Sequence, residues 1–413
     1  MKAHLKIDMT EATRLTREGR LHEALAVLRG EVPEPNKFAD DCTCGPKGAS
    51  KGPSEGAGSL IDMSPPSSTG GSWTSQLTDQ PTAPPTGNVS SALGRKPLHG
   101  LINGLGKLGS MPRFPAMGRS ATGRGPVPLP QGAQFADRSY GNEAGQRAYK
   151  LYVPSNYTGQ STPLVIMLHG CTQSPDDFAA GTRMNELAEE HSFLVAYPAQ
   201  NQSANPSKCW NWFNAGHQQR DRGEPSLIAG ITRQIISEFS VDPARVFIAG
   251  LSAGGATAAV MGAAYPDLYA AIGVHSGLAC GAASDMQSAF AAMRNGSSGP
   301  SARSRRHGGP VPTIVFHGDG DGTVSPINGV HVIDQAKAGV DLQTTVRRGE
   351  APEGTMYTCT VHADEDGHAI FEHWLLHGVG HAWSGGSDAG SYTEPRGPDA
   401  SREMLRFFLK NRL

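Results

Sequence analysis

Residues 245–259 read RVFIAGLSAGGATAA, and this stretch says most about the fold. Its first part, RVFIA, is an apolar run of the kind that forms a buried strand in a parallel sheet. The pentapeptide GLSAG (250–254) follows, and a run of small residues that favours a closely packed helix begins at Ala256. A G-x-S-x-G sequence between a strand and a helix is typical of a nucleophile elbow, a sharp turn that exposes a serine hydroxyl. The alternative is a glycine-rich loop without chemistry, and the flanking strand and helix favour the elbow at Ser252.

Strand-like and helix-like segments alternate on both sides of the elbow. Apolar or alternating runs predict strands at 147–153, 163–168, 193–197, 245–249, 313–316 and 370–375. Helical patterns predict helices at 176–191, 224–239, 256–264 and 404–409. This alternation predicts an α/β fold with a mostly parallel central sheet and helices on both faces. Because ligands of such sheets bind beyond the carboxyl ends of the strands, we expect the chemistry to lie just after the apolar runs.

Composition divides the 413 residues into three parts. Residues 1–30 carry apolar residues at helical spacing, and we expect one short helix there. Residues 31–136 are rich in Gly, Pro, Ser and Thr, and such a composition predicts a largely disordered linker because it buries too little apolar surface. Residues 137–413 have ordinary composition, and we expect one α/β domain. Within it, residues 286–306 form either a mobile lid or a long surface loop.

The charge balance excludes several classes of protein. Lys plus Arg is 36 and Asp plus Glu is 38, which gives no signature of binding to nucleic acid or to an anionic membrane. No apolar run approaches the ~20 residues of a membrane-spanning helix.

No apolar stretch of a secretory signal follows residues 1–8, so we expect a cytoplasmic location. The six cysteines are too few and too scattered for a disulfide scaffold.

An elbow serine requires an orienting carboxylate and a base, which follow it in that order along the chain in this class of site. The strand predicted at 313–316 is followed by HGDGDGTV (317–324). Asp319 and Asp321 both compete for the role of the acid, and either of them is equally a turn residue before glycine.

The candidate bases lie near the C-terminus. Five histidines lie within 20 residues: His362, His368, His373, His377 and His381. The last three are four residues apart, as on one face of a metal-binding helix, but Gly378 and Gly380 interrupt a helix there. On a strand the same residues would spread over ~13 Å, too far for one ion, so we predict no metal site. His381 is the best base, because it lies in a glycine-rich loop after the last predicted strand and can reach a site at the sheet edge.

Acyl transfer also requires two hydrogen-bond donors for an oxyanion. One is expected to be the backbone N–H of Ala253, the residue after the nucleophile. The second is expected from the loop after the strand PLVIML (163–168), which reads HGCTQ (169–173), and Cys171 N–H is the candidate. The chemistry requires no metal or organic cofactor.

These residues together resemble the polyhydroxybutyrate (PHB) depolymerase family of esterases, which is related to feruloyl and acetyl-xylan esterases. The resemblance covers about residues 140–410. It rests on these segments: LHGCTQSPDDFA (168–179), CWNWF (209–213), RVFIAGLSAGGATAA (245–259), HGDGDGTV (317–324) and GHAWSGG (380–386).

The resemblance implies an α/β-hydrolase fold over 137–413 and a role for particular residues. The nucleophile of the family corresponds to Ser252, its acid to Asp321 and not Asp319, and its base to His381. A disulfide between Cys171 and Cys209 is implied, although a cytoplasmic chain is expected to keep these thiols reduced. The aromatic residues of the substrate cleft correspond to the following: Trp210, Trp212 and Trp383.

The resemblance implies hydrolysis of short-chain polyhydroxyalkanoate or of its oligomers through an acyl-enzyme. A feruloyl or acetyl-xylan type of carbohydrate esterase and an acyltransferase are alternatives, because all of these enzymes form the same intermediate. A non-catalytic protein that binds polymer granules is a remote alternative, which the complete set of candidate triad residues disfavours. Members of the family are commonly secreted, so an extracellular location is the alternative to the cytoplasm.

Overall fold

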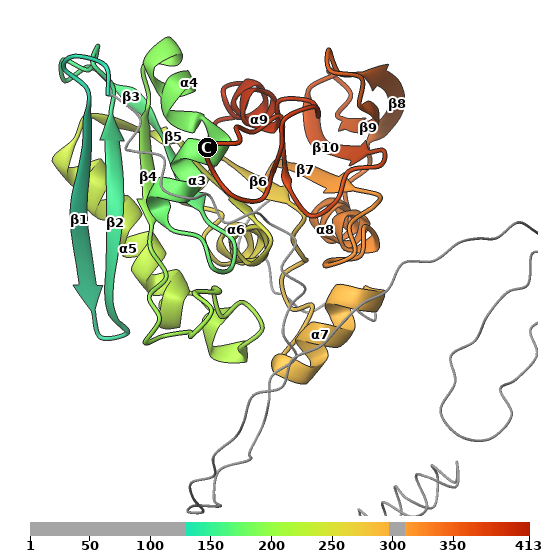
Figure 1. The fold of residues 1–413 in the computed structure, drawn as a ribbon, viewed down its shortest axis with the longest axis horizontal. Helices are drawn as coiled ribbons and strands as arrows, with labels where there is room; N and C mark the ends of the chain where they lie inside the picture. Colours follow the sequence, from blue (N-terminus) through green and yellow to red (C-terminus); the bar gives the residue numbers. More distant parts are fainter. Residues whose placement is uncertain (1–128, 297–309) are drawn as a thin grey trace, which may run out of the picture. The chain divides into compact units, whose positions relative to one another are not determined.

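The computed structural model describes residues 129–296 and 310–413 of the chain. Its centre is a ten-stranded sheet with the order β1-β2-β4-β3-β5-β6-β7-β10-β9-β8 (Figure 1). The strands are β1 (Gln134–Asn142), β2 (Gly145–Val153), β3 (Thr162–Leu168), β4 (Leu194–Pro198), β5 (Val241–Leu251), β6 (Ala271–His275), β7 (Thr313–Gly318), β8 (Gln343–Glu350), β9 (Met356–Ala363) and β10 (Ala369–Leu376). A separate two-stranded sheet pairs β11 (Trp383–Ser384) with β12 (Thr393–Glu394).

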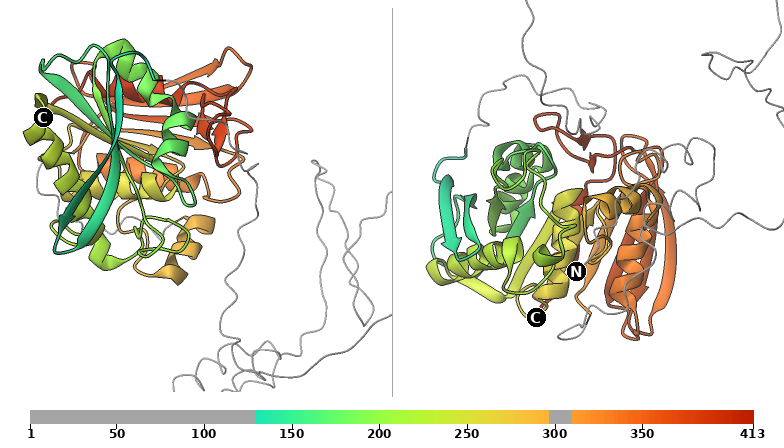
Figure 2. Two further views of the ribbon diagram at one scale, coloured as in Figure 1. Left: turned by 60° about the vertical axis from the view of Figure 1, so that its left-hand side comes forward. Right: turned by 90° about the horizontal axis from the view of Figure 1, so that it is seen from below.

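The interior of the large sheet is parallel. Strands β4, β3, β5, β6, β7 and β10 all run in one direction. The hairpin β1–β2 extends one side by antiparallel pairing, and β9 and β8 extend the other. The sheet is twisted, so the β1–β2 pair crosses the direction of β8 to β10 at a steep angle (Figure 2). The parallel interior confirms the predicted fold class.

Helices cover both faces of the sheet. They are α3 (Pro175–Thr182), α4 (Met184–His191), α5 (Gly223–Glu238), α6 (Ala253–Ala264), α7 (Met286–Asn295), α8 (Ile327–Lys337) and α9 (Ala400–Phe408), with a short 3-10 turn η1 (Ala215–His217). Strand β3 shows how the two cores arise. Leu164, Ile166 and Leu168 pack with α5, α6 and α8, whereas Val165 and Met167 pack with α3, α4 and α9. A continuous apolar strand is therefore buried on both sides.

The structure differs from the sequence-based expectation in a few elements. The helix predicted at 176–191 is two helices, because Arg183 has a left-handed φ of 56° and ends α3. Strands β1, β6, β8 and β9 of the large sheet and helices α7 and α8 were not predicted. Strand β6 is only five residues long, and β8 is a polar, exposed edge strand that lacks an apolar pattern.

Several expectations fall on the rest of the chain. The helix predicted at 1–30 lies outside the described residues, and so does most of the linker predicted at 31–136; the first described strand begins at Gln134. The segment 286–306 begins as helix α7, and its continuation after residue 296 is likewise outside. Within the described ranges, no helix has the length and apolar character to cross a membrane.

Candidate active site

Ser252 occupies a sharp turn between β5 and α6, where the pentapeptide predicted a nucleophile elbow. Its backbone has φ 56° and ψ −117°, a strained conformation for a residue with a side chain, and such strain is characteristic of functional sites. A Cβ on Gly254 would lie 2.1 Å from the carbonyl oxygen of Leu168, and one on Gly250 would lie 2.4 Å from the Gly254 carbonyl carbon. Both positions therefore accept only glycine, which explains the G-x-S-x-G spacing. Ser252 itself is partly exposed, at the N-terminus of α6.

Asp321 lies in the loop after β7, and the Nδ1 atom of His381 is 2.7 Å from its Oδ2 atom. The other carboxylate oxygen accepts the backbone N–H groups of Thr323 at 2.9 Å and Val324 at 2.8 Å. A second ring nitrogen, His317 Nε2, lies 3.4 Å from Oδ2. The Asp321 side chain is fully buried, whereas that of His381 keeps 13% of its surface exposed. The carboxylate is therefore held from several sides, and the imidazole reaches the surface.

The surroundings of Asp321 keep it ionised. Burial by itself raises the pKa of its carboxyl group, but hydrogen bonds from His317, His381 and the Val324 N–H, with the attraction to His381, outweigh it. The pKa of Asp321 is consequently held well below its usual range. A buried carboxylate that accepts from Nδ1–H holds the imidazole in the tautomer whose Nε2 can accept a proton. The pair thus has the geometry of an oriented general base.

The competing acid, Asp319, forms a different pair. Its Oδ2 atom lies 2.8 Å from Nδ1 of His377, and its Oδ1 atom accepts the Gly378 N–H at 2.7 Å. The second ring nitrogen of His377 is also engaged, 2.9 Å from the hydroxyl oxygen of Thr358. Both side chains are 40% exposed. This pair ties the loop after β7 to the end of β10, and it leaves no free imidazole nitrogen for a substrate.

The topology brings Ser252, Asp321 and His381 to one edge of the sheet. They follow β5, β7 and β10, which are parallel strands separated only by β6 within the sheet order. The Ser252 N–H donates to the carbonyl oxygen of His275 at the end of β6, at 2.8 Å. The Gly320 N–H donates to Val379 O at 3.1 Å, which joins the loops that hold the acid and the base. Among the described residues, the Ser252 hydroxyl has no hydrogen-bond partner.

The oxyanion candidates lie where β3 meets the elbow. The close approach of Gly254 to Leu168 brings the start of α6 directly against the loop after β3. Within the described residues, the backbone N–H groups of Cys171 and Ala253 donate to no protein acceptor, so both are available to a ligand. Cys171 forms the disulfide with Cys209 that the resemblance implied, with Cα atoms 4.2 Å apart. The bond joins the candidate oxyanion loop to the CWNWF segment.

Comparisons with known proteins show the family of the chain. A sequence profile of the esterase PHB depolymerase family matches residues 147–354, half of the chain. The chain belongs to this family. Poly(3-hydroxyalkanoate) depolymerase C of Paucimonas lemoignei is 32% identical over 252 residues, which are 59% of this chain and 60% of that protein. Probable acetylxylan esterase A of Aspergillus clavatus is 29% identical over 206 residues, 46% of this chain and 65% of that one. The chain thus spans less than two thirds of the length of either relative.

A solved structure supports the family's fold. The acetyl xylan esterase from Aspergillus awamori superposes with a TM-score of 0.52 at 21% identity, over 64% of this chain and 94% of that one. At this identity the likeness concerns the fold alone. The described part of this family member therefore has an α/β-hydrolase fold, as the resemblance implied.

The three tryptophans do not line a cleft as expected. Trp210, Trp212 and Trp383 are 0%, 5% and 1% exposed and belong to the two hydrophobic cores. Two of the indole N–H groups donate inside the protein: Trp210 Nε1 to the carbonyl oxygen of His169 at 3.1 Å, and Trp383 Nε1 to the Ser401 hydroxyl at 3.0 Å. Burial argues against the expected role, because side chains with at most 5% of their surface exposed offer a substrate almost nothing to contact.

Tyr392 is an aromatic residue near the site that the sequence did not reveal. It is partly exposed, has a strained φ of 55°, and its hydroxyl lies 3.1 Å from Thr172 Oγ1, next to Cys171. The preceding residue is locked in place, because Asp177 accepts both the N–H and the hydroxyl of Ser391. The only sequence signal was the polar segment after GHAWSGG, which has no pattern of its own.

Three other histidines of the C-terminal segment, His362, His368 and His373, have contacts elsewhere in the fold. His362 Nδ1 lies 2.9 Å from Thr344 Oγ1, and His368 Nε2 lies 3.0 Å from the side-chain oxygen of Asn411. His373 lies on β10 toward α8, where burial lowers its pKa to about 4. Over the described ranges, no group of three or more His, Cys, Asp or Glu side chains is arranged to hold a metal ion.

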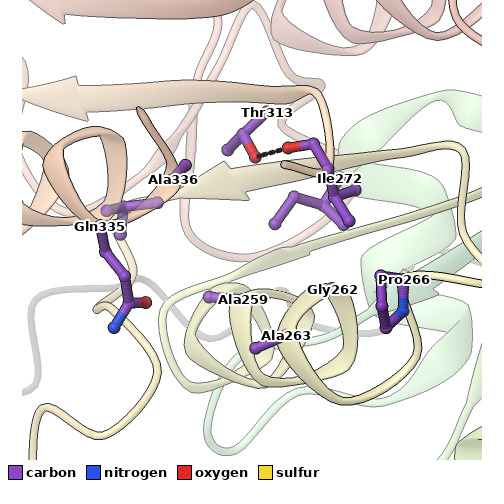
Figure 3. Close-up of a pocket in the computed structure, with 10 residues that line it drawn as sticks. Ala259, Gly262, Ala263, Pro266, Ile272, Thr313, Gln335 and Ala336 are labelled. Atoms are coloured by element: carbon purple, nitrogen blue, oxygen red, sulfur yellow. Dashed lines mark hydrogen bonds between the residues drawn. The ribbon is translucent and has the colours of Figure 1, made fainter. Parts of the chain in front are cut away.

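A pocket lies away from this site, on the side of the sheet that α6 and α8 cover (Figure 3). It is lined by small and apolar residues: Ala259, Gly262, Ala263, Pro266, Ile272, Val311, Thr313, Val332, Gln335 and Ala336. None of these is a candidate site residue, and no charged or nucleophilic side chain other than a threonine hydroxyl is among them. That hydroxyl, of Thr313, already donates to the carbonyl oxygen of Val311 at 2.8 Å.

Proposed function

We propose that this protein is a serine hydrolase of carboxylic esters, with Ser252 as nucleophile, His381 as base and Asp321 as orienting acid. The observation that carries the proposal is the buried Asp321–His381 hydrogen bond of 2.7 Å on the sheet edge that also presents the strained Ser252 elbow. An oriented imidazole on the same sheet edge as a partly exposed serine at a helix N-terminus is the arrangement from which nucleophilic acyl transfer can proceed.

The reaction then proceeds through an acyl-enzyme. His381 Nε2 takes the proton of the Ser252 hydroxyl as its oxygen attacks the ester carbonyl carbon. The resulting oxyanion accepts hydrogen bonds from the N–H groups of Cys171 and Ala253. The C–O bond to the alcohol breaks, and His381 returns the proton to the leaving alcohol. A water molecule, deprotonated by His381, next attacks the acyl carbon and releases the carboxylic acid while Ser252 regains its proton.

We propose short-chain poly(3-hydroxyalkanoate) or its oligomers as substrate, so that the released acid is a hydroxy acid. Two relatives support this choice: the Paucimonas lemoignei protein and the poly(3-hydroxybutyrate) depolymerase of Ralstonia pickettii, 29% identical over 145 residues. A carbohydrate esterase is the second candidate, because several relatives are acetylxylan esterases and one is a feruloyl esterase.

We also propose that the protein works in an oxidising compartment, outside the cytoplasm. The Cys171–Cys209 disulfide supports this location, because reducing thiol buffers keep cysteines unpaired in the cytosol. The location expected from the first residues alone is therefore not the one we favour.

Covalent labelling tests the reaction class. A fluorophosphonate probe is expected to label the wild-type protein at one serine and to leave Ser252→Ala unlabelled. Hydrolysis of p-nitrophenyl butyrate should fall by on the order of 10⁶ in the same variant, as for loss of other serine nucleophiles. Equal labelling of both proteins would remove Ser252 from the mechanism.

A substrate panel separates the two candidate substrates. The kcat/KM values are compared for soluble 3-hydroxybutyrate oligomers, acetylated xylan and methyl ferulate, and release of acid is measured from emulsified poly(3-hydroxybutyrate). Preference for the oligomers or the polymer supports the proposal. Preference for xylan acetate or for the ferulate ester would replace it with the carbohydrate esterase.

A further inference from the structure

His275, the last residue of β6, touches both sides of the candidate site without belonging to its predicted residues. Strand β6 lies between β5, which carries the elbow, and β7, which carries the acid. The carbonyl oxygen of His275 accepts the Ser252 N–H at 2.8 Å. Its ring atom Nε2 accepts the backbone N–H of Ser384 at 3.0 Å, and Ser384 follows His381 by three residues. One fully buried residue thus binds the nucleophile's turn and the base's loop.

The hydrogen bonds fix the form of the imidazole. A nitrogen that accepts an N–H must carry a lone pair, so Nε2 is unprotonated and the ring proton is on Nδ1. Nδ1 lies 3.2 Å from the Ser276 hydroxyl oxygen, which accepts that proton. The ring stacks on Phe316 at 5.8 Å and on Trp383 at 5.1 Å. These contacts specify one ring orientation as well as one tautomer.

The electrostatic surroundings keep this ring neutral. Burial, and then the nearby imidazoles of His317 and His381, lower the pKa of His275 well below its usual value, and the opposing effect of Asp321 is smaller. The bond to Ser384 is therefore kept at any pH at which an esterase base works. Protonation of Nε2 would place two donors against each other in a site without water exposure.

The distance from His381 to Ser252 depends on how the loop after β10 is held. The Asp321 contact fixes the Nδ1 side of His381. Backbone bonds hold the loop on either side of the base: Val379 O accepts the Gly320 N–H, and the Trp383 N–H donates to Tyr392 O. The bond from the Ser384 N–H to His275 differs from these attachments, because it leads to the residue that also binds the Ser252 backbone. A misplacement of about 1 Å between reacting groups can cost on the order of 10² in rate.

We propose that His275 is a positioning residue that sets the separation between the Ser252 hydroxyl and the His381 imidazole. The inference rests on the proposed function, because it concerns the efficiency of that nucleophile and base. Its chemistry is specific: an acceptor at the position of Nε2 is required, and the packing of an aromatic ring alone is not sufficient.

Three substitutions separate the acceptor from the ring. His275→Gln places an amide oxygen near the position of Nε2 and keeps an acceptor for Ser384. His275→Asn places its amide near Nδ1, where only Ser276 is in reach. His275→Phe keeps the stacked ring and removes both nitrogens. His373→Gln is the control, since His373 is a partly buried histidine whose pKa is also lowered, and its buried Nε2 has no hydrogen-bond partner within the described residues.

The readouts are kcat and KM for p-nitrophenyl butyrate and the rate of fluorophosphonate labelling, each measured well below the unfolding temperature of every variant. We expect His275→Asn and His275→Phe to lose about 10²-fold in kcat with KM nearly unchanged. His275→Gln should recover to within about fivefold of wild type, and the His373→Gln control should stay within about twofold, since removing an unbonded side-chain nitrogen breaks no hydrogen bond.

Two results would overturn the inference. One is a folded Phe or Asn variant with wild-type kcat, and the other is a Gln variant as slow as the Phe variant. If the variants do not fold, the proposal can still be tested on the wild-type protein. The 15N chemical shifts of His275 should show the Nδ1–H tautomer, and an Nε2–H tautomer would contradict the proposal. Absence of labelling in the wild type would instead refute the proposed function itself.

Discussion

The Asp321→Asn substitution tests the candidate site most directly, because the geometry around the carboxylate dictates how the amide must turn. In the wild type, Oδ2 accepts from His381 Nδ1, and Oδ1 accepts from the N–H groups of Thr323 and Val324. The asparagine oxygen is drawn to the two backbone donors, so its NH₂ group faces the histidine. An NH₂ group that faces Nδ1 favours the tautomer with its proton on Nε2, which cannot accept the Ser252 proton.

The magnitude follows from this tautomer change. A misprotonated base of this kind costs roughly 10⁴ in kcat, equivalent to about 5.4 kcal/mol of transition-state stabilisation. Asp319→Asn is the matched control, because Asp319 also pairs with a histidine, but in a half-exposed position away from the elbow. An exposed ion pair contributes at most about 1 kcal/mol to stability. Even if all of this were lost from the transition state, kcat would fall by a factor of about five. The two variants should therefore differ by on the order of 10³ in kcat.

The assay is the kcat of p-nitrophenyl butyrate hydrolysis at neutral pH for both variants, with thermal unfolding curves to show that each is folded. Comparable activity of the two variants would refute the argument that Asp321 orients the base. A larger loss in Asp319→Asn would transfer the role of the acid to the exposed pair.

The remaining predictions concern the scaffold. Gly254→Ala should prevent folding or abolish activity, because the new Cβ would collide with the backbone oxygen at the end of β3. The control Gly322→Ala has open space at its Cβ and should leave the thermal unfolding temperature unchanged. A folded and active Gly254→Ala variant would contradict the tight-turn argument. Replacing Cys171 and Cys209 together by alanine should lower the unfolding free energy by about 4 kcal/mol from the loop of 38 residues, with an unchanged denaturation midpoint as the contrary result. Deleting residues 1–130, whose composition predicts no packed core, should leave kcat/KM on a soluble ester unchanged, and loss of soluble protein would show that this segment completes the domain.

The residues that sequence could predict are those whose role requires a local pattern. The elbow needs small residues on both sides of Ser252, and such a requirement is visible in five consecutive letters. The acid and the base follow strands in the order that the fold imposes, so the loops that carry them could be inferred once the strands were recognised. The choice of Asp321 over Asp319 came from the family resemblance. The structure places these two at hydrogen-bonding distance.

What the sequence could not reveal depends on contacts between distant segments. Nothing around Trp210 indicates that the carbonyl oxygen of His169 takes its indole N–H and draws it into the core. Likewise, the buried Glu224 accepts two hydrogen bonds from Asn211, and it thereby fixes CWNWF from a helix further along the chain. His275 stood in a short, unpredicted strand, so its two contacts could only be found in three dimensions.

The position of β10 within the sheet has a consequence for local unfolding. The strand that leads to His381 is paired with β7 on one side and with β9 on the other, and β8 lies beyond β9 as the outermost strand. Strands open most readily at an edge, where one row of backbone groups has no partner. Fraying therefore begins at β8, whose exposed Arg347 and Arg348 also discourage pairing with another chain. Amide hydrogens of β8 should exchange with solvent faster than those of β10. The strand that leads to His381 therefore stays ordered when the edge strand unfolds locally.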